Sequence, residues 1–498
     1  LAAAIVSSAS PGVCAEPASR PVIRLSGGDF GAPNPFRHYN RGPGIYKMEL
    51  VYDSLLQRDE KGIIPWLAEH YETSGDGKIL TFRLVQGAKW HDGRPVTADD
   101  VLFTFDYCSR HKPVRDNLSY RGKSLIEKAW ADGPHSVAVM LTEPAVTALE
   151  RIGNVRILPK HVWEKVEDPL TYEGEGWLTG CGPFRLDRYD PIQGAYRMVA
   201  VDDYWGQQPA VSALEWVPIA NGPLAFDRGE LDLLVLNPTM AEKYKGQPDC
   251  KMLSVYGMHC FHLLMNPKRV APLGERQVRQ AVLTGIDREK MVRWLEKGYG
   301  LLGSQGYVPS TSPWHNPQIP RYDHDPRQAE KLLGGRTLEA TLTVGNTPKE
   351  VKMAEMVRND LEKIGIVLKV RSLDGKARDA AVRDGDYEMA IVKYGGLGGD
   401  PGYLSSVFRS GGHKAFKLVD WSDPELDRLL DAQEVERDPR RRKEIVFEIQ
   451  RRIAEELPVA MLYGEIDNTA YKPAHYDGWR IQYNHTKPEH CKLSYLER

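Results

Sequence analysis

The sequence predicts a mixed α/β protein with more than one lobe, and three observations support this fold class. The chain has 498 residues, which is more than one ordinary hydrophobic core holds, so two or three lobes are expected. Segments that alternate apolar and polar residues, as half-buried strands do, are interspersed with segments of helical spacing along the whole chain. The apolar content of 41% is ordinary for a protein with buried cores.

Composition and motifs exclude several classes of function. The formal net charge is −2 and basic residues are interspersed with acidic ones, so there is no electrostatic basis for binding nucleic acid or acidic membranes. No apolar run after the first residues is long enough to span a bilayer. The chain contains no P-loop, GxSxG elbow or HExxH motif, so we do not expect an enzyme.

The first residues resemble the end of a secretory signal. Small residues at Val13 and Ala15 predict cleavage after Ala15, which makes residues 1–15 a signal-peptide remnant. The residues before Cys14 do not suit a lipoprotein site, so we expect a periplasmic protein without a lipid anchor.

Five cysteines remain after this cleavage. An odd number in an oxidising compartment favours at most two disulfides and one free thiol. Cys250 and Cys260 are close enough in sequence to be joined, but spacing alone leaves this pairing open.

The most distinctive local pattern lies in residues 62–105. Residues 80–84 alternate as a strand does, and Thr97 begins a helix whose first turn carries two aspartates, as the helix dipole favours. Val101 and Phe105 continue on one face of that helix. This order resembles the signature of the family 5 solute-binding proteins of bacterial ABC importers, which are receptors for dipeptides, oligopeptides and nickel.

Two later segments also match the family pattern, so that the resemblance covers about residues 20–498. It implies a two-lobed periplasmic-binding-protein fold with an extra subdomain and a ligand cleft at the hinge. Lobe I is expected at 20–254 plus 471–498, with the extra subdomain at about 51–172, and lobe II at 255–470. Closure of the hinge around a ligand is the motion that this layout supports.

A glycine-rich loop after a predicted strand at 388–392 is the main candidate for a ligand site. Glycines let a backbone approach a ligand closely, and strand ends are where open α/β sheets bind ligands. In peptide-binding members of the family an aspartate of this loop pairs with the peptide's α-ammonium group, and Asp400 matches it. Tyr394, Tyr403 and Arg409 belong to the same loop region. The alternative is that Asp400 only begins a turn with Pro401.

The same loop also resembles that of the nickel-binding members, in which a histidine follows the aspartate by thirteen residues. His413 stands at that position and is the predicted metal ligand. The match is incomplete, because Gly399 replaces a tyrosine of those proteins and Tyr394 stands for a tryptophan. The alternative is a histidine with a surface or packing role.

Two further residues are predicted to contact the ligand. Arg156 lies roughly where nickel-binding members place an arginine that pairs with carboxylates of the metal's chelator, although a strand-edge arginine would look the same. Tyr39 belongs to a segment that resembles the family's first cleft-lining loop, where an aromatic ring packs on a ligand or only on the fold. His259 and His262 are not expected to share a metal, because they point to opposite faces of a strand.

Taken together, the sequence predicts a periplasmic receptor of an ABC importer that binds a small peptide or a metal chelate by hinge closure. The closed form would deliver its cargo to a membrane permease, while separate subunits hydrolyse ATP. We expect a monomer that meets the membrane only through the permease, binds no nucleic acid and has no cofactor, nickel chelate being cargo. The alternatives are a receptor for nickel or another transition-metal chelate and, more remotely, a secreted metal-dependent hydrolase.

Overall fold

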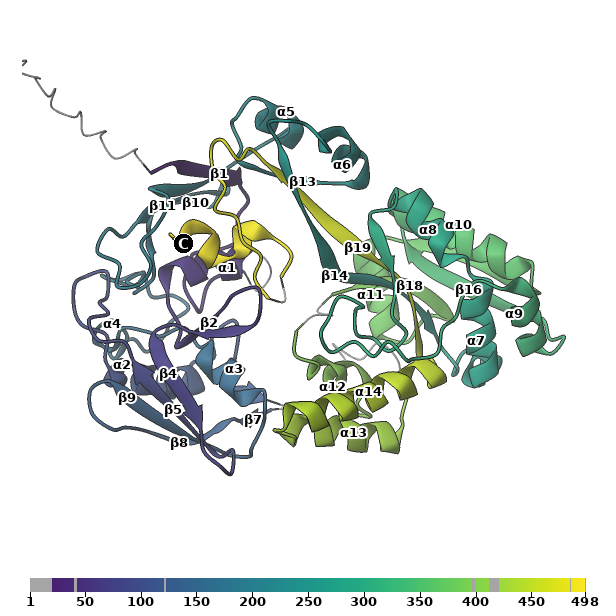
Figure 1. Cartoon of the computed structure of the whole chain (residues 1–498), viewed down its shortest axis with the longest axis horizontal. Coiled ribbons are helices and arrows are strands. Elements are labelled where there is room, and N and C mark those ends of the chain that lie inside the picture. Colours follow the sequence, from purple (N-terminus) through teal and green to yellow (C-terminus); the bar gives the residue numbers. More distant parts are fainter. Residues whose placement is uncertain are drawn as a thin grey trace, which may run out of the picture.

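The computed structural model describes residues 20–39, 43–120, 122–395, 399–411, 421–483 and 485–497. The chain forms two lobes of mixed α/β structure, as the sequence predicts. Two long antiparallel strands, β14 (Lys251–Met265) and β19 (Val459–Tyr471), run from one lobe to the other (Figure 1). The predicted lobe boundaries near residues 254 and 470 fall inside these strands and stay predictions.

The first lobe is built on a four-stranded sheet with the order β1-β12-β11-β10. Strand β1 pairs in parallel with β12, and the other neighbours are antiparallel. One large core joins this sheet to helix α1 and to the subdomain beside it. The elements are β1 (Val22–Ser26), α1 (Pro43–Val51), β10 (Phe184–Asp190), β11 (Ala195–Ala200) and β12 (Ala213–Val217).

The subdomain of this lobe contains a second antiparallel sheet with the order β4-β5-β9-β8. Helix α2 begins as predicted, because Thr97 and Asp100 form a reciprocal capping box at its first turn. The elements are β2 (Leu56–Arg58), β3 (Ile63–Pro65), β4 (Ala68–Thr73), β5 (Ile79–Leu84), α2 (Ala98–Arg110), β6 (Ser119–Tyr120), β7 (Lys123–Ser124), β8 (Ile126–Ala131), β9 (Ser136–Leu141), α3 (Ala148–Gly153) and α4 (Lys160–Trp163).

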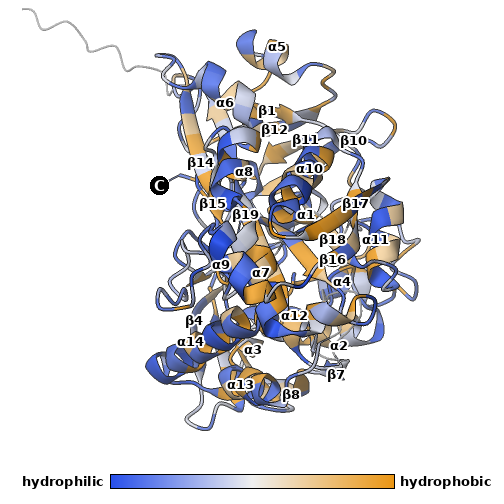
Figure 2. Ribbon diagram, turned by 90° about the vertical axis from the view of Figure 1, so that its right-hand side faces the viewer, coloured by the Kyte–Doolittle hydropathy of each residue, from blue (hydrophilic) through white to orange (hydrophobic). Residues whose placement is uncertain are grey.

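The second lobe is built on a seven-stranded sheet with the order β13-β19-β14-β18-β16-β17, and β15 pairs with β19. Figure 2 shows apolar strands β16, β17 and β18 and mainly polar residues on α9 and α14. The strands are β13 (Leu233–Leu236), β15 (Gly300–Leu302), β16 (Leu338–Gly345), β17 (Ile366–Leu373) and β18 (Met389–Tyr394). Helices α5 (Gly222–Asp227) and α6 (Pro238–Tyr244) pack with β13 at the end of this sheet that lies near β1 of the first lobe (Figure 1). The helices of the second lobe are α7 (Arg276–Gly285), α8 (Arg288–Leu295), α9 (Pro326–Leu333), α10 (Pro348–Glu362), α11 (Gly375–Arg383), α12 (Tyr403–Phe408), α13 (Pro424–Val435) and α14 (Pro439–Glu456).

The central strands of this sheet are buried on both faces. Phe261 and Leu263 of β14 belong to the core beneath α7 and α10, whereas Cys260 and Leu264 belong to the core beneath α12, α13 and α14. Such strands read as continuous apolar runs because each face meets its own layer of helices.

Strand β14 is longer than the sequence pattern indicates. The sequence predicts a strand that contains His259 and His262, and β14 extends it back to Lys251 because β19 pairs with it along both halves. The register shifts between Tyr256 and Cys260, so the ladder has an irregularity where the two lobes meet.

The C-terminal segment after β19 packs back on the first lobe. Lys492 donates to Asp53 across 2.5 Å, and both residues are buried. Trp66, Tyr204 and Trp205 also donate to the Asp53 carboxylate. A buried charge with this many partners fixes the tail in place.

The described cysteines are all free, so the pairing of Cys250 with Cys260 that spacing left open does not form. Cys260 is buried in strand β14, and Cys250 directly precedes that strand, so an extended backbone separates them. Cys14 and the predicted signal remnant lie outside the described residues. Within the described ranges, no helix is both long and apolar enough to cross a membrane.

Candidate functional site

A cavity of about 310 Å³ lies between the two lobes. The first lobe lines it with residues from 35–58, 108–120 and 147–156, and the second lobe contributes four residues from 400–406. The second-lobe residues come from the turn after β18 and the start of α12, which is where the sequence predicts the ligand loop. Its volume is at the lower end of the range of about 300–1,000 Å³ that is usual for small-molecule sites.

Asp400 lines this cavity, but its charge already has a partner in the protein. Arg442 of α14 donates to both carboxylate oxygens, at 2.5 and 2.6 Å, in a bidentate pair. Gly402 also donates its backbone N–H to Asp400, so the carboxylate shapes the turn as the alternative interpretation proposes. The Asp400 side chain keeps 26% of its surface exposed, which leaves it accessible from the cavity. Its predicted contact with an ammonium group stays a prediction.

Arg156 lines the same cavity from the first lobe. It forms an ion pair with Glu49 of α1 and donates to the hydroxyl of Ser54 at 2.6 Å. Burial raises the pKa of the Glu49 carboxyl, but Arg156 and other nearby basic groups outweigh it, so this pKa is lowered. Arg156 is therefore a paired, 9% exposed guanidinium rather than an unpaired charge. Its predicted contact with a ligand carboxylate stays a prediction.

The cavity holds more basic than acidic side chains. Its three acidic residues each have an arginine partner: Glu49 with Arg156, Glu150 with Arg58, and Asp400 with Arg442. Two more arginines of the lining, Arg115 and Arg151, form no ion pair within the described part of the chain. Two guanidinium charges thus remain uncompensated, and an anionic group in the cavity would neutralise them.

Arg151 is held in a fixed position although it lacks an acidic partner. Its guanidinium donates to the carbonyl oxygens of Ser119 and Asp116 and lies 5.2 Å from the centre of the Tyr120 ring. Burial lowers the pKa of Arg151, and the nearby Tyr120, Asp116 and Glu150 offset this only in part.

The other predicted residues of the loop region separate into two groups. Tyr403 lines the cavity and donates its hydroxyl to the carbonyl of Tyr307 at 2.8 Å. Tyr394 packs against the core beneath α12 to α14 and is absent from the cavity lining. Arg409 is also absent from the lining, because it pairs with Asp431 of α13.

The loop of the first lobe that contains Tyr39 contributes to the cavity lining through Pro35, not through Tyr39. Pro35 lines the cavity, whereas the Tyr39 side chain is 54% exposed and lies outside the lining. Phe36 is buried against Tyr107 and Trp163, so its role is in packing.

The predicted metal ligand His413 lies outside the described residues. The described residues form no group of three side chains that could hold a metal ion. His262 is fully buried beside Tyr307, and burial lowers its pKa to about 3. His259 instead lies beside Gly395, at the end of the β18 strand.

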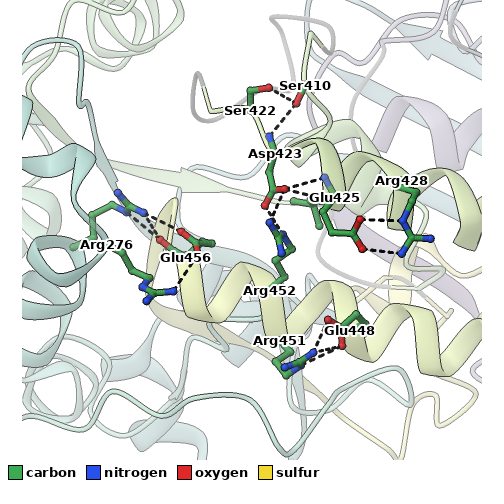
Figure 3. Close-up of polar contacts among 12 residues, drawn as sticks. Arg276, Ser410, Ser422, Asp423, Glu425, Arg428, Glu448, Arg451, Arg452 and Glu456 are labelled. Carbon is green, nitrogen blue, oxygen red and sulfur yellow. Dashed lines mark hydrogen bonds and ion pairs between the residues drawn. The ribbon is translucent and has the colours of Figure 1, made fainter.

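A polar network fixes the elements that follow the loop (Figure 3). Asp423 caps the start of α13, and Arg452 of α14 donates to both oxygens of its carboxylate. The backbone N–H of Asp423 and the hydroxyl of Ser422 both donate to the hydroxyl of Ser410, just beyond α12. Helices α12, α13 and α14 therefore form one scaffold that positions Asp400 and Tyr403.

Sequence reasoning missed most of the charged lining. These residues lie in two helices, a strand and a loop that carry no motif of their own: Glu49, Arg58, Arg115, Glu150 and Arg151. A weak signal was present, since two of these residues, Glu150 and Arg151, lie shortly before Arg156 in the sequence. Charge spacing alone does not tell a cavity wall from a solvated surface.

Comparison with known families gives one extended match. Residues 62–416 match the sequence profile described as Bacterial extracellular solute-binding proteins, family 5 Middle. The dipeptide-binding protein of Escherichia coli (strain K12) is 26% identical over 378 residues, which cover 70% of this chain and 70% of that protein. The oligopeptide-binding protein AppA of Bacillus subtilis (strain 168) is 25% identical over 492 residues, 91% of this chain and 88% of that protein.

Solved structures support the same fold. NikA from Brucella suis, in complex with Fe(III)-EDTA, superposes with a TM-score of 0.80 at 22% identity, covering 96% of this chain and 99% of that chain. DppA from Helicobacter pylori, in complex with the peptide STSA, superposes with a TM-score of 0.72 at 21% identity, covering 96% and 98%. At this identity the two structures establish the shared fold only.

Proposed function

Because the chain belongs to the bacterial extracellular solute-binding proteins of family 5, we propose that it captures a small peptide or a metal chelate for an ABC importer. The observation that carries the proposal is the cavity between the lobes, to which both lobes contribute charged side chains. A ligand that contacts both walls stabilises the closed arrangement, and a permease can distinguish that arrangement from the open one.

The charge balance of the cavity favours a ligand with a carboxylate. Arg115 and Arg151 supply uncompensated positive charge, which suits the C-terminal carboxylate of a short peptide. In this proposal the ammonium end of the peptide lies near Asp400, whose carboxylate oxygens are shared with Arg442.

The related proteins suggest the cellular setting. We propose a periplasmic receptor, active as a monomer, that passes its cargo to a membrane permease whose separate ATPase subunits supply the energy. The protein would make and break no bond in its cargo, because selection by such a receptor needs only complementary contacts.

Isothermal titration of ligand-stripped protein with peptides of two to five residues tests the peptide proposal. We expect saturable binding that weakens in Asp400→Asn, which keeps the shape of the side chain beside the buried Arg442. Urea unfolding of this variant shows whether any loss of binding reflects a lost contact or a damaged fold. Unchanged peptide affinity in a folded Asp400→Asn protein would contradict the ammonium contact.

A transition-metal chelate is the second candidate. It is favoured by the same uncompensated arginines, since guanidinium groups pair well with the carboxylates of a chelator. Titration with nickel plus histidine, on the parent and on His413→Ala, separates it from the peptide proposal. Tight binding of nickel-histidine that His413→Ala abolishes would favour the chelate, and equal binding by both proteins would remove His413 as a ligand.

A further inference from the structure

A second cavity lies beside the first, also between the lobes. It has a volume of about 440 Å³ and is lined by residues from 120–125 and 142–145 of the first lobe and from 431–435 of helix α13. Among the described residues, Tyr120 is the one that lines both cavities. Tyr120 thus belongs to the partition between the proposed ligand site and a larger neighbouring space.

Residues of both lobes contact the Tyr120 side chain. In its own lobe, the Arg151 guanidinium lies 5.2 Å from the ring centre and also donates to the carbonyl of Ser119. Across the lobe boundary, the Tyr120 hydroxyl donates to the Glu434 carboxylate at 2.8 Å. The Glu434 carbonyl in turn accepts from the backbone N–H of Val146 at 3.0 Å. Glu434 is only 8% exposed, so this partition is anchored in packed structure.

We propose that Tyr120 is a specificity-determining residue that limits the length of the ligand, and that the second cavity is a subsite for longer ligands. The inference rests on the proposed peptide-binding function. A short peptide fits the first cavity while the contact between Tyr120 and Glu434 stays intact. A longer peptide must displace the Tyr120 ring from Arg151 and Glu434, so the free energy of its extra contacts is offset by the loss of these contacts.

The partition also couples ligand length to closure of the lobes. Tyr120 belongs to the first lobe and Glu434 to α13 of the second, so a ligand that separates them removes a contact between the lobes. A peptide that ends before Tyr120 leaves this contact in place. The protein therefore selects short ligands in two ways: a short ligand gains contacts in the first cavity, and a long ligand breaks the Tyr120–Glu434 contact between the lobes.

Titration of the full chain with alanine peptides of two, three, four and five residues tests the proposal. The parent should bind the dipeptide or tripeptide best. Tyr120→Ala should join the cavities and raise the affinity for the pentapeptide, relative to the dipeptide, by about tenfold or more. Tyr120→Phe keeps the ring and should keep the parent's order of preference, although it loses the hydrogen bond. Trp294→Ala, at a 74% exposed site far in sequence from both linings, is the matched control.

Tyr120→Leu serves as a second opening variant if Tyr120→Ala does not fold, because leucine keeps apolar packing while removing the ring. The same length preference in the parent and in a folded opening variant overturns the inference and leaves the proposed function standing. A parent that binds no peptide of any length overturns the proposed peptide binding, and the inference falls with it.

Discussion

The two lobes are joined in different ways on the two sides of the cavity. On one side β14 and β19 pass between the lobes as continuous strands that pair along most of their length. On the other side the helix-pair corner contacts the subdomain through a few hydrogen bonds. We define this corner as residues 434–437, the end of α13 and the first residues after it. Arg437 donates there to the carbonyls of Gly75 and Ser74, at 2.5 and 3.1 Å.

The difference indicates which side moves. Two backbone crossings keep the lobes together in every state, whereas a few separate hydrogen bonds, those of Arg437 exposed to solvent, break at a smaller cost. The register shift after Tyr256 interrupts the ladder where the lobes meet and gives the crossing strands a place to bend. We therefore expect opening to separate the helix-pair corner from the subdomain while β14 and β19 stay paired.

A substitution on the side of the cavity where β14 and β19 cross should give the largest effect, a loss of stability. The Tyr256 ring covers Gly464, and a Cβ added there would lie 2.4 Å from the Tyr256 hydroxyl oxygen. Gly464→Ala should displace this ring and lower the free energy of unfolding by about 1–3 kcal/mol, as overpacking does. Urea unfolding measures the loss. Gly375→Ala is the matched control, because nothing lies within 4 Å of its added Cβ. Equal unfolding midpoints for the two variants would show that the Tyr256 packing contributes nothing.

Breaking the opposite side should affect binding more than folding. Arg437→Ala removes both hydrogen bonds to the turn between β4 and β5, at a cost on the order of 1 kcal/mol to the closed form. Ligand affinity should therefore weaken about fivefold, and the radius of gyration in small-angle scattering should increase. Arg440→Ala, at an exposed site on the start of α14, should change neither quantity. An Arg437→Ala protein that binds and scatters like the parent would show that this contact does not hold the lobes closed.

His485, near the β14–β19 crossing, should make stability depend on pH, and we expect this effect to be the smallest. His485 accepts from the backbone N–H of Lys487 at its Nδ1, and its Nε2 lies 3.3 Å from Nδ1 of His490. The Tyr46 ring packs against both imidazoles. Burial, assisted by the charge of Lys487, lowers the pKa of His485 to about 4, with Glu49, Asp467 and His259 as the other charged or titratable neighbours.

The sign of the pH effect follows from this lowered pKa. Between the ordinary histidine pKa of about 6.5 and the folded value of about 4, the unfolded chain binds the proton more readily. Stability should therefore fall as the pH falls through this window. Between pH 7 and pH 4.5 the Tm of His485→Asn should fall less than the Tm of the parent. The Tm of His324→Asn, at an exposed site, should fall as much as that of the parent. Parallel Tm curves for parent and His485→Asn would rule out His485 as the source.

Local structure was predictable where a few neighbouring residues decide it. The helix start at Thr97 forms as expected, because a helix end needs only nearby side chains. Asp438 and Pro439 begin α14 in the same local way. The start of β14 was not predictable from its own residues, since pairing with β19 extends the strand back to Lys251. The position of Asp400 at a cavity followed from its loop, whereas its pairing with Arg442 did not.

The sequence by itself determined the family, the α/β class and the loop that carries Asp400, because these depend on local patterns that recur at fixed spacing. Only the tertiary structure decided the charge balance of the cavity and the wall at Tyr120. The reason is that Arg156 meets Glu49, and Tyr120 meets Glu434, across long stretches of chain. Such contacts exist only once separate elements pack together, so no local pattern records them.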